Sequence, residues 1–196
     1  MVDVSNSSSQ TQANRVVILV SGTGTLLQAL IDAAVGYEII AVVSDKACPA
    51  LDRTEAAGIP SIVVPFAKGE DRAAWDAQML TTVRDLNPDL VVSAGFMRIL
   101  GAEFVHAFTV INTHPALLPS FPGAHAVRDA LAYGVKITGT TVHRVDEGVD
   151  TGPIIAQRAV PVEPGDTEES LHERIKIEER QLIVEVIKNF TQDSPK

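Results

Sequence analysis

Four polar side chains between residues 110 and 155 have the types needed to stabilise a negative charge and to move a proton. They are one amide, two imidazoles and one carboxylate, each among turn residues and short apolar runs: Asn112, His114, His143 and Asp150. Brought together, an amide and an imidazole can stabilise an oxyanion, and a carboxylate beside a histidine can help to transfer a proton. Such chemistry requires neither a metal ion nor a covalent nucleophile.

The spacing of these residues indicates where they would meet. Asn112 ends an apolar run and His114 follows two residues later, so in an extended chain both side chains lie on the same side of the backbone. The carboxyl edge of an open α/β sheet is where ligands bind. The structural alternatives are a loop-capping pair for Asn112 and His114, a satisfied interior histidine for His143 and an Asx turn for Asp150. In the functional interpretation Asp150 pairs with His114 and favours its charged form.

The elements that must position these residues alternate between short apolar strands and helical patterns. Strands are expected at 16–20, 39–44, 61–64, 90–94 and 108–112, and helices from about 26, around 53–57 and over 71–86. This alternation predicts an α/β fold with one doubly wound, mostly parallel sheet and helices on both faces. After a proline-rich loop at 114–123, a helix is expected at 126–133. Strands at 137–145 and 154–162 are expected as antiparallel additions at one side.

The last helix has a carboxylate in the middle of its apolar stripe. Asp166 is expected to cap this helix, with Glu169 as the partner in a capping box, and the pattern runs to about residue 189. Glu179 shares an arc with the apolar residues of the stripe, so it is either a ligand contact or a salt-bridged residue at the helix edge. Lys176 borders the same face and is a candidate charge partner for a bound phosphate.

The turn at 21–25 follows a strand and precedes a helix. Free backbone N–H groups at a helix N-terminus favour an anion such as phosphate, and glycine permits its close approach. A dinucleotide site would need a third glycine at Leu27, and a Walker loop would need a Gly-Lys pair, so neither motif fits. The structural alternative is a tight turn without a ligand.

The composition limits the class of protein. The chain has 196 residues, 45% of them hydrophobic, which suffices for one domain with a full core. A formal charge of −9 without a basic stripe argues against nucleic acid and favours small-molecule substrates. The single Cys48 excludes an internal disulfide and a thiolate zinc site and fits a reducing compartment, so we expect a cytoplasmic protein.

The N-terminal residues, the apolar runs and the remaining histidines allow further expectations. Residues 1–14 are polar, without the basic start and apolar core of a signal peptide, so we expect a disordered tail before a single domain at 15–196. No apolar run approaches the roughly 18 residues of a membrane span. A His-Glu-x-x-His spacing is absent, so no metal is expected. His106, His125 and His172 lack comparable neighbours and are interpreted as structural.

Several longer motifs resemble those of the folate-dependent formyltransferases. They are INTHPALLPSFPG at 111–123, TTVH at 140–143 and DTGPII at 150–155. Two more, VSGTGTLLQ at 20–28 and AGFMRIL at 94–100, narrow the resemblance to the members that formylate glycinamide ribonucleotide in de novo purine biosynthesis. The resemblance covers about residues 15–190 and implies a Rossmann-like formyltransferase fold.

The resemblance also implies roles for individual residues. Asn112, His114 and Asp150 match the catalytic trio. The nucleotide phosphate would bind at Gly24, Thr25 and Leu26, and Glu179 would contact the same substrate. Folate would bind at the following positions: Arg72, Met97, Arg98, Ile99, Leu100, Asn112, His143, Asp146, Glu147, Gly148, Val149 and Asp150. Leu26 stands where the family has asparagine, so a side-chain contact to the nucleotide is lost and the backbone donors remain.

The implied reaction transfers a formyl group from 10-formyltetrahydrofolate to the amine of glycinamide ribonucleotide. Asn112 and a protonated His114 would stabilise the tetrahedral oxyanion, and Asp150 would relay the amine proton. The implied partners are these two small molecules, with no nucleic acid and no membrane, and a homodimer is compatible with the sequence.

Other functions are weighed against this one. A formyltetrahydrofolate hydrolase carries an N-terminal regulatory domain, for which 14 residues are too short. A methionyl-tRNA formyltransferase needs a basic RNA-binding extension. A non-catalytic folate or nucleotide binder would not need the complete set of Asn112, His114 and Asp150. A nicotinamide-dependent dehydrogenase is disfavoured by Leu27.

Overall fold

The computed structural model describes residues 14–33, 35–67 and 69–190. The polar tail expected at 1–14 lies outside these residues except for Asn14, which begins the first strand. In chain order the elements are β1 Asn14–Val20, α1 Thr25–Ala33, β2 Tyr37–Ser44, α2 Ala50–Ala56, β3 Ser61–Val63, α3 Arg72–Leu86, β4 Leu90–Ser93, α4 Ala102–Ala107, β5 Val110–His114, α5 Ala126–Tyr133, β6 Ile137–Arg144, β7 Ile154–Pro161 and α6 Glu168–Lys188.

The strands form one seven-stranded sheet in the order β3-β2-β1-β4-β5-β6-β7. All pairs from β3 to β5 are parallel, and β6 and β7 are added antiparallel beside β5. The expected doubly wound, mostly parallel sheet is therefore confirmed. The strand order reverses between β1 and β4, and in such sheets the crevice at this reversal, outside the carboxyl ends of the strands, binds ligands.

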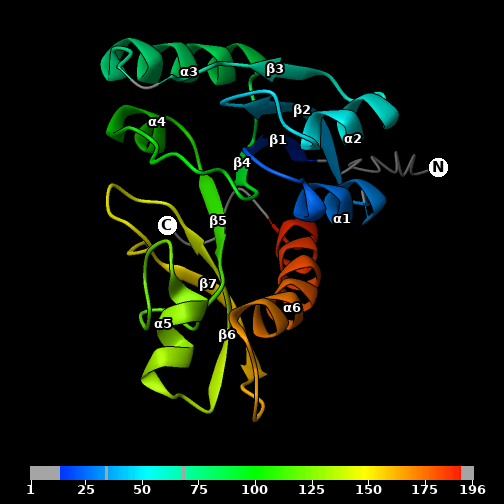
Figure 1. Ribbon diagram of the computed structural model, residues 1–196. Coiled ribbons are helices and arrows are strands. Elements are labelled where there is room, and N and C mark those ends of the chain that lie inside the picture. The colour runs from blue at the N-terminus through cyan, green and yellow to red at the C-terminus, as the bar shows by residue number, and fades with distance from the viewer. Residues whose placement is uncertain (1–13, 34, 68, 191–196) are drawn as a thin grey trace, which may run out of the picture.

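Helices cover both faces of the sheet (Figure 1). Alternate residues of β1 enter two different cores, because side chains of a strand point to opposite faces. Val16, Ile18 and Val20 pack with residues of α1 and α6, whereas Val17 and Leu19 pack with residues of α3 and α4. This explains the continuous apolar run that predicted a strand buried on both faces.

Several details differ from the sequence expectation. The short α4 was not expected, and β5 runs two residues further than the expected strand, so His114 belongs to the strand and not to the loop. The N-cap of α6 is Thr167, which forms a capping box with Ser170, and not Asp166 with Glu169. Asp166 instead accepts hydrogen bonds from Ser170 Oγ and from Arg174. None of the helices in the described part of the chain has the length and apolar character of a membrane span.

Candidate active site

The four polar residues meet beside the carboxyl end of β5. Asn112 and His114 lie on β5, His143 lies on the antiparallel neighbour β6, and Asp150 lies on the loop that joins β6 to β7. The sheet register pairs Asn112 directly with His143. Side chains of directly opposed residues lie on the same face of a sheet. The two strands thus supply three of the four side chains, and the loop brings the carboxylate to them.

The Asp150 carboxylate contacts both histidines. Its Oδ2 lies 3.2 Å from His114 Nδ1 and its Oδ1 lies 3.5 Å from His143 Nε2. Asn112 Nδ2 lies 3.3 Å from the same His143 nitrogen. The side chains of His114, His143 and Asp150 are 4%, 2% and 11% exposed, so little water screens their charges.

The partners of the ring nitrogens indicate the protonation of each histidine. His114 Nε2 lies 2.8 Å from the carbonyl oxygen of Phe121, and its Nδ1 faces Asp150, so both nitrogens face acceptors. Only the imidazolium satisfies both. His143 Nδ1 lies 2.7 Å from the carbonyl oxygen of Arg144 and therefore carries a proton. The other nitrogen, Nε2, lies between Asn112 Nδ2 and Asp150 Oδ1.

Asp150 is held in its charged form. Its hydrogen bond with His143 lowers the pKa of the carboxyl most, and the backbone N–H of Gly123 and the charges of both histidines lower it further. Burial acts in the opposite direction, but the net pKa lies below the ordinary value of 3.8. At neutral pH this group is an anion that faces the Nδ1 of His114.

The backbone conformation of the loop places the Asp150 side chain beside the two histidines. Asp150 has a φ of 55°, in the left-handed region that aspartate tolerates better than most residues. Asp146 folds the loop, because its Oδ1 accepts from the Gly148 N–H at 3.0 Å and from Thr151 Oγ1 at 2.7 Å. A Cβ at Gly152 would lie 2.0 Å from a carbonyl oxygen of β6, so only glycine fits there.

The turn after β1 presents backbone groups and not the Leu26 side chain. Gly24 has a φ of 71°, and a Cβ on it would lie 2.7 Å from the Cβ of Ala50. Thr25 begins α1 and is exposed, whereas Leu26 is only 7% exposed and packs in the core. Leu26 is thus a core residue. Sequence reasoning missed Arg53, whose Nε donates to the Thr23 carbonyl at 2.8 Å and brings a cation to the turn.

Glu179 approaches β5 from the opposite face. It contacts Thr113, which alternates with Asn112 and His114 along the strand. Burial raises the pKa of Glu179, and the hydrogen bond with Thr113 and the nearby charge of Lys176 oppose this shift. Lys176 Nζ itself lies 2.7 Å from Glu173 of the same helix, so its charge is already paired.

Segment 97–100, which was expected to bind folate, is anchored by its neighbours. The Met97 N–H donates to Ser21 Oγ at 2.9 Å, and Arg72 donates to the Ile99 carbonyl. The side chains of Met97 and Ile99 are 74% and 63% exposed, whereas Leu100 is buried. The guanidinium of Arg98 is engaged by Asp45, so the exposed groups of the segment are the two apolar side chains.

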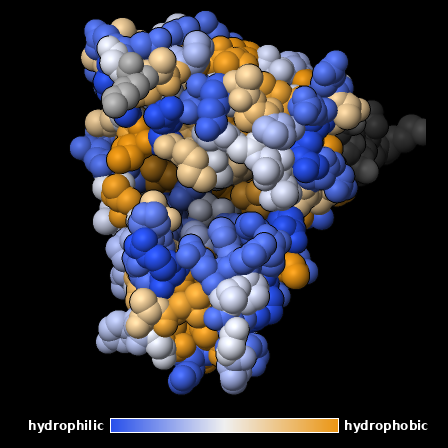
Figure 2. Space-filling model, viewed as in Figure 1, coloured by the Kyte–Doolittle hydropathy of each residue, from blue (hydrophilic) through white to orange (hydrophobic). Residues whose placement is uncertain are grey.

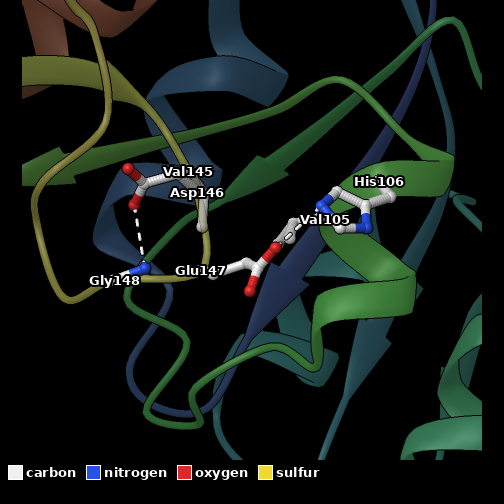
Figure 3. A pocket seen from close by; sticks show the side chains of 6 residues that line it. All are labelled: Val105, His106, Val145, Asp146, Glu147 and Gly148. Atoms are coloured by element: carbon white, nitrogen blue, oxygen red, sulfur yellow. Dashed lines mark hydrogen bonds and ion pairs between the residues drawn. The ribbon is translucent and has the colours of Figure 1, made fainter.

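A cavity of about 370 Å³ lies between α4 and the loop that carries Asp150. Figure 3 shows the side chains that line it, including Glu147 of the loop, which reaches toward His106 of α4. His106 Nε2 and Glu147 Oε1 are 2.9 Å apart, so His106 has a carboxylate partner that the sequence did not reveal. Val149, another of the loop residues expected to bind folate, is 50% exposed. The full lining is Val105, His106, Val145, Asp146, Glu147 and Gly148.

The surface agrees with a binding region at this edge of the sheet. Figure 2 shows that this face is hollowed between the part carrying α3 and α4 and the part carrying α5, and that hydrophobic side chains lie along the hollow. Among the residues that the structure describes, no group of three or more His, Cys, Asp or Glu side chains is arranged to hold a metal ion.

Comparisons with known proteins point to one family. Residues 14–187 match the model of the family described as formyl transferase. Phosphoribosylglycinamide formyltransferase of Mycobacterium tuberculosis (strain CDC 1551 / Oshkosh) is 54% identical over 178 residues, which are 88% of this chain and 83% of that protein. The trifunctional purine biosynthetic protein adenosine-3 of Bos taurus is 46% identical over 180 residues, 88% of this chain and 18% of its own length.

The solved structures agree with this similarity. Glycinamide ribonucleotide transformylase 1 from Symbiobacterium toebii superposes with a TM-score of 0.86 at 42% identity. The superposition covers 90% of this chain and 86% of that one.

Proposed function

The chain belongs to the formyl transferase family, and on this premise we propose that it transfers the formyl group of 10-formyltetrahydrofolate to the amine of glycinamide ribonucleotide in purine biosynthesis. The family match spans residues 14–187. One observation carries the proposal most directly. A charged Asp150, whose side chain is 11% exposed, contacts His114 and His143 beside Asn112, at the sheet edge where such folds bind ligands.

The chemistry follows from these four side chains. The substrate amine attacks the formyl carbon, a C–N bond forms, and the carbonyl oxygen becomes an oxyanion. Asn112 Nδ2 donates a hydrogen bond to that oxygen, and the positive charge of the His114 imidazolium, whose two nitrogens face Phe121 and Asp150, stabilises it electrostatically in a site with little water. The oxyanion then collapses, the bond from carbon to the folate nitrogen breaks, and tetrahydrofolate leaves.

A proton must pass from the attacking amine to the departing folate nitrogen. The pKa of Asp150 is lowered, so this carboxylate is a weak base whose main task is to keep His114 charged and oriented. A histidine exchanges protons readily near neutral pH. We therefore assign the transfer to Asp150 and His114 acting together, directly or through a water molecule, with His143 holding the second carboxylate oxygen.

The nucleotide is assigned to the turn after β1 and to α6. Its phosphate would accept hydrogen bonds from the backbone N–H groups at Gly24, Thr25 and Leu26, at the N-terminus of α1. Arg53, which is held against this turn, would add a positive charge. Glu179 would contact the substrate near β5, and Lys176, already paired with Glu173, would contribute less.

The folate is assigned to the cavity between α4 and the loop that carries Asp150, away from the turn after β1. The cavity of about 370 Å³ between α4 and the loop has an apolar wall from Val105 and Val145 and polar groups on the loop. These features suit a flat heteroaromatic ring with hydrogen-bonding edges. Met97 and Ile99, exposed on the neighbouring segment, would contact the rest of the cosubstrate.

Two finer statements belong to the proposal. The reaction is expected to proceed without a metal ion, because Asn112 and His114 supply the charge stabilisation; full activity in EDTA would support this, and loss of activity restored by Zn²⁺ would contradict it. The enzyme is expected in the cytoplasm. A chain with one cysteine forms no internal disulfide, so it does not need an oxidising compartment to fold.

An assay with and without the acceptor tests the whole proposal. The protein is supplied with 10-formyltetrahydrofolate, and the release of tetrahydrofolate and of formate is followed with and without glycinamide ribonucleotide. Release of tetrahydrofolate only with the nucleotide, without formate, is the expected result. Release of formate without the nucleotide would identify a hydrolase instead, and no turnover with binding of both ligands would identify a non-catalytic binder.

A further inference from the structure

Asp45 is a buried carboxylate to which the proposed reaction gives no part. It follows β2 directly, and its side chain is 1% exposed. Its Oδ2 accepts a hydrogen bond of 2.7 Å from Arg98 Nε, whereas Oδ1 has no hydrogen-bond partner in the described part of the chain. Removing a charged group from water is costly unless its oxygens are fully paired. Stability alone therefore does not explain a carboxylate at this position.

The partner of Asp45 is fixed from more than one side. Arg98 Nη2 donates to the carbonyl of Phe66 at 3.2 Å, and the guanidinium lies 5.2 Å from the centroid of the Phe66 ring. The backbone N–H of Phe66 donates in turn to the carbonyl of Asp45 at 3.3 Å. The side chain of Asp45 thus binds Arg98, and its backbone carbonyl binds Phe66, the residue whose ring lies beside Arg98.

Arg98 is one of three anchors of segment 97–100. The other two come from separate elements, Ser21 after β1 and Arg72 at the start of α3. These contacts fix the backbone of the segment but leave the side chains of Met97 and Ile99 exposed. A rigid backbone that carries exposed apolar side chains is suited to receive a ligand, because little ordering remains to be done on binding.

We propose that Asp45 is a positioning residue for the formyl donor: through Arg98 it fixes the segment 97–100 against which the folate binds. The inference rests on the proposed function, which assigns this segment to the cosubstrate. Asp45 is too buried to touch either substrate, so its removal should act on folate affinity and leave the chemical step and the nucleotide site intact.

The chain offers a matched control for this test. Asp166 and Arg174 form a second aspartate–arginine pair, with side chains 5% and 35% exposed, against 1% and 35% for Asp45 and Arg98. This pair connects the residue before the N-cap of α6 to the helix itself. Asp166→Asn therefore removes a comparable covered charge at a place to which the proposal gives no ligand.

The experiment compares Asp45→Ala, Asp45→Asn and Asp166→Asn with the wild-type protein. Steady-state kinetics give kcat and both KM values, and calorimetry with 5-formyltetrahydrofolate, a non-reacting isomer, gives folate affinity. For Asp45→Ala we expect the folate KM and Kd to rise about tenfold, the loss typical of a charge-assisted hydrogen bond. The nucleotide KM and kcat should stay within about twofold of wild type.

The other two variants decide between positioning and general stability. Asp45→Asn keeps one neutral acceptor for Arg98 but loses the charge, so the folate KM and Kd should rise by about threefold, less than in Asp45→Ala. Asp166→Asn should leave both KM values unchanged, whatever its effect on Tm. The emission of Trp75, the single tryptophan, adds a readout, because Arg72 lies 5.1 Å from its ring centroid and also holds Ile99. Its spectrum should change in Asp45→Ala and not in Asp166→Asn.

Each outcome supports or overturns the inference. An unchanged folate KM in Asp45→Ala, or an equal rise in both KM values, overturns it even if the wild type is an active transferase. If Asp45→Ala does not fold, Asp45→Asn decides, since a folate KM and a Trp75 spectrum identical to those of Asp166→Asn exclude positioning. If the wild type binds 5-formyltetrahydrofolate but forms no product, the proposed function fails and the calorimetric comparison still decides the role of Asp45.

Discussion

Two histidine–carboxylate pairs are attached to the same loop, and they differ mainly in exposure. His114 Nδ1 and Asp150 Oδ2 are 3.2 Å apart, with side chains 4% and 11% exposed. His106 Nε2 and Glu147 Oε1 are closer, at 2.9 Å, but their side chains are 69% and 64% exposed. Water and salt screen an exposed pair, and holding two mobile side chains together costs entropy. Burial, and not distance, therefore separates the pair that we assign to catalysis from the exposed pair.

The number of partners separates the pairs further. Besides His114, the Asp150 carboxylate contacts His143 and accepts the Gly123 N–H at 2.8 Å. It is thus bound to β5, to β6 and to the proline-rich loop at once. A group held at several points keeps its geometry through a reaction, which is the condition for stabilising a transition state. Four predictions, from the largest expected effect to the smallest, test this comparison.

Replacing His114 by asparagine should have the largest effect. The variant loses the positive charge assigned to stabilise the developing oxyanion, so kcat should fall by about 10²–10⁴-fold. Both KM values should change by less than about threefold, because the role is assigned to the transition state. Asp150→Asn should behave similarly. Steady-state kinetics on both variants provide the measurement, and a loss confined to KM would remove these residues from the catalytic role.

Glu179 contacts Thr113 on the opposite face of β5, and its replacement should have an intermediate effect. In Glu179→Gln we expect the Kd for glycinamide ribonucleotide to rise about tenfold, the value of one hydrogen bond to a charged group, while folate affinity stays constant. Calorimetric titration of both ligands measures this. An unaltered nucleotide Kd would return Glu179 to a structural role as the partner of Thr113.

Acid unfolding should reveal how much the charged form of Asp150 stabilises the fold. The pKa of Asp150 is lower in the folded protein than its ordinary value of 3.8, so its charged form adds stability above that value, and this stability is lost as the pH falls through the folded pKa. The Tm of wild type minus that of Asp150→Asn should thus be steady between about pH 6 and 5 and become smaller below about pH 4. Calorimetric scans across this range give the test, and a difference that grows toward acid pH would contradict the assigned direction.

The smallest effect is expected at the exposed pair. Glu147→Gln and His106→Ala should each change kcat and the folate KM by less than about fivefold, which corresponds to the upper limit for an exposed ion pair. The effect should shrink further in 0.5 M salt, with screening over about 4 Å. A change of a hundredfold in either variant would show that distance outweighs burial here.

Most of the parallel sheet could be predicted because its strands are buried on both faces. Continuous apolar runs such as Val16–Val20 need no tertiary information to be recognised. The antiparallel β6 and β7 were also expected, although β7 is mostly exposed. Helix α4, by contrast, has six residues, too few for a periodic pattern. At the start of α6, Asp166 and Thr167 are both good caps, and only the contact of Asp166 with Arg174 decides between them.

The candidate site was predictable where residues are close in sequence or belong to a long motif. Asn112 and His114 share a strand, and the motif around Asp150 marks the turn that brings this residue back to them. The partner of His106 was missed because Glu147 lies 41 positions away on a different element, and no periodicity links the two. Asp45 and Arg98 were missed as a pair for the same reason. The roles assigned to these residues remain predictions.

The pairing of Asn112 with His143 makes the site sensitive to changes in chain length. A shift of β6 by one residue would place Val142 or Arg144 opposite Asn112 and turn His143 toward the face covered by α6. The Thr141 hydroxyl opposes such a slip, since it donates to the Ala116 carbonyl and accepts from the Leu118 N–H. A single-residue insertion or deletion in β6 would therefore be as damaging as the loss of His143 itself, although every one of the four polar residues would still be encoded.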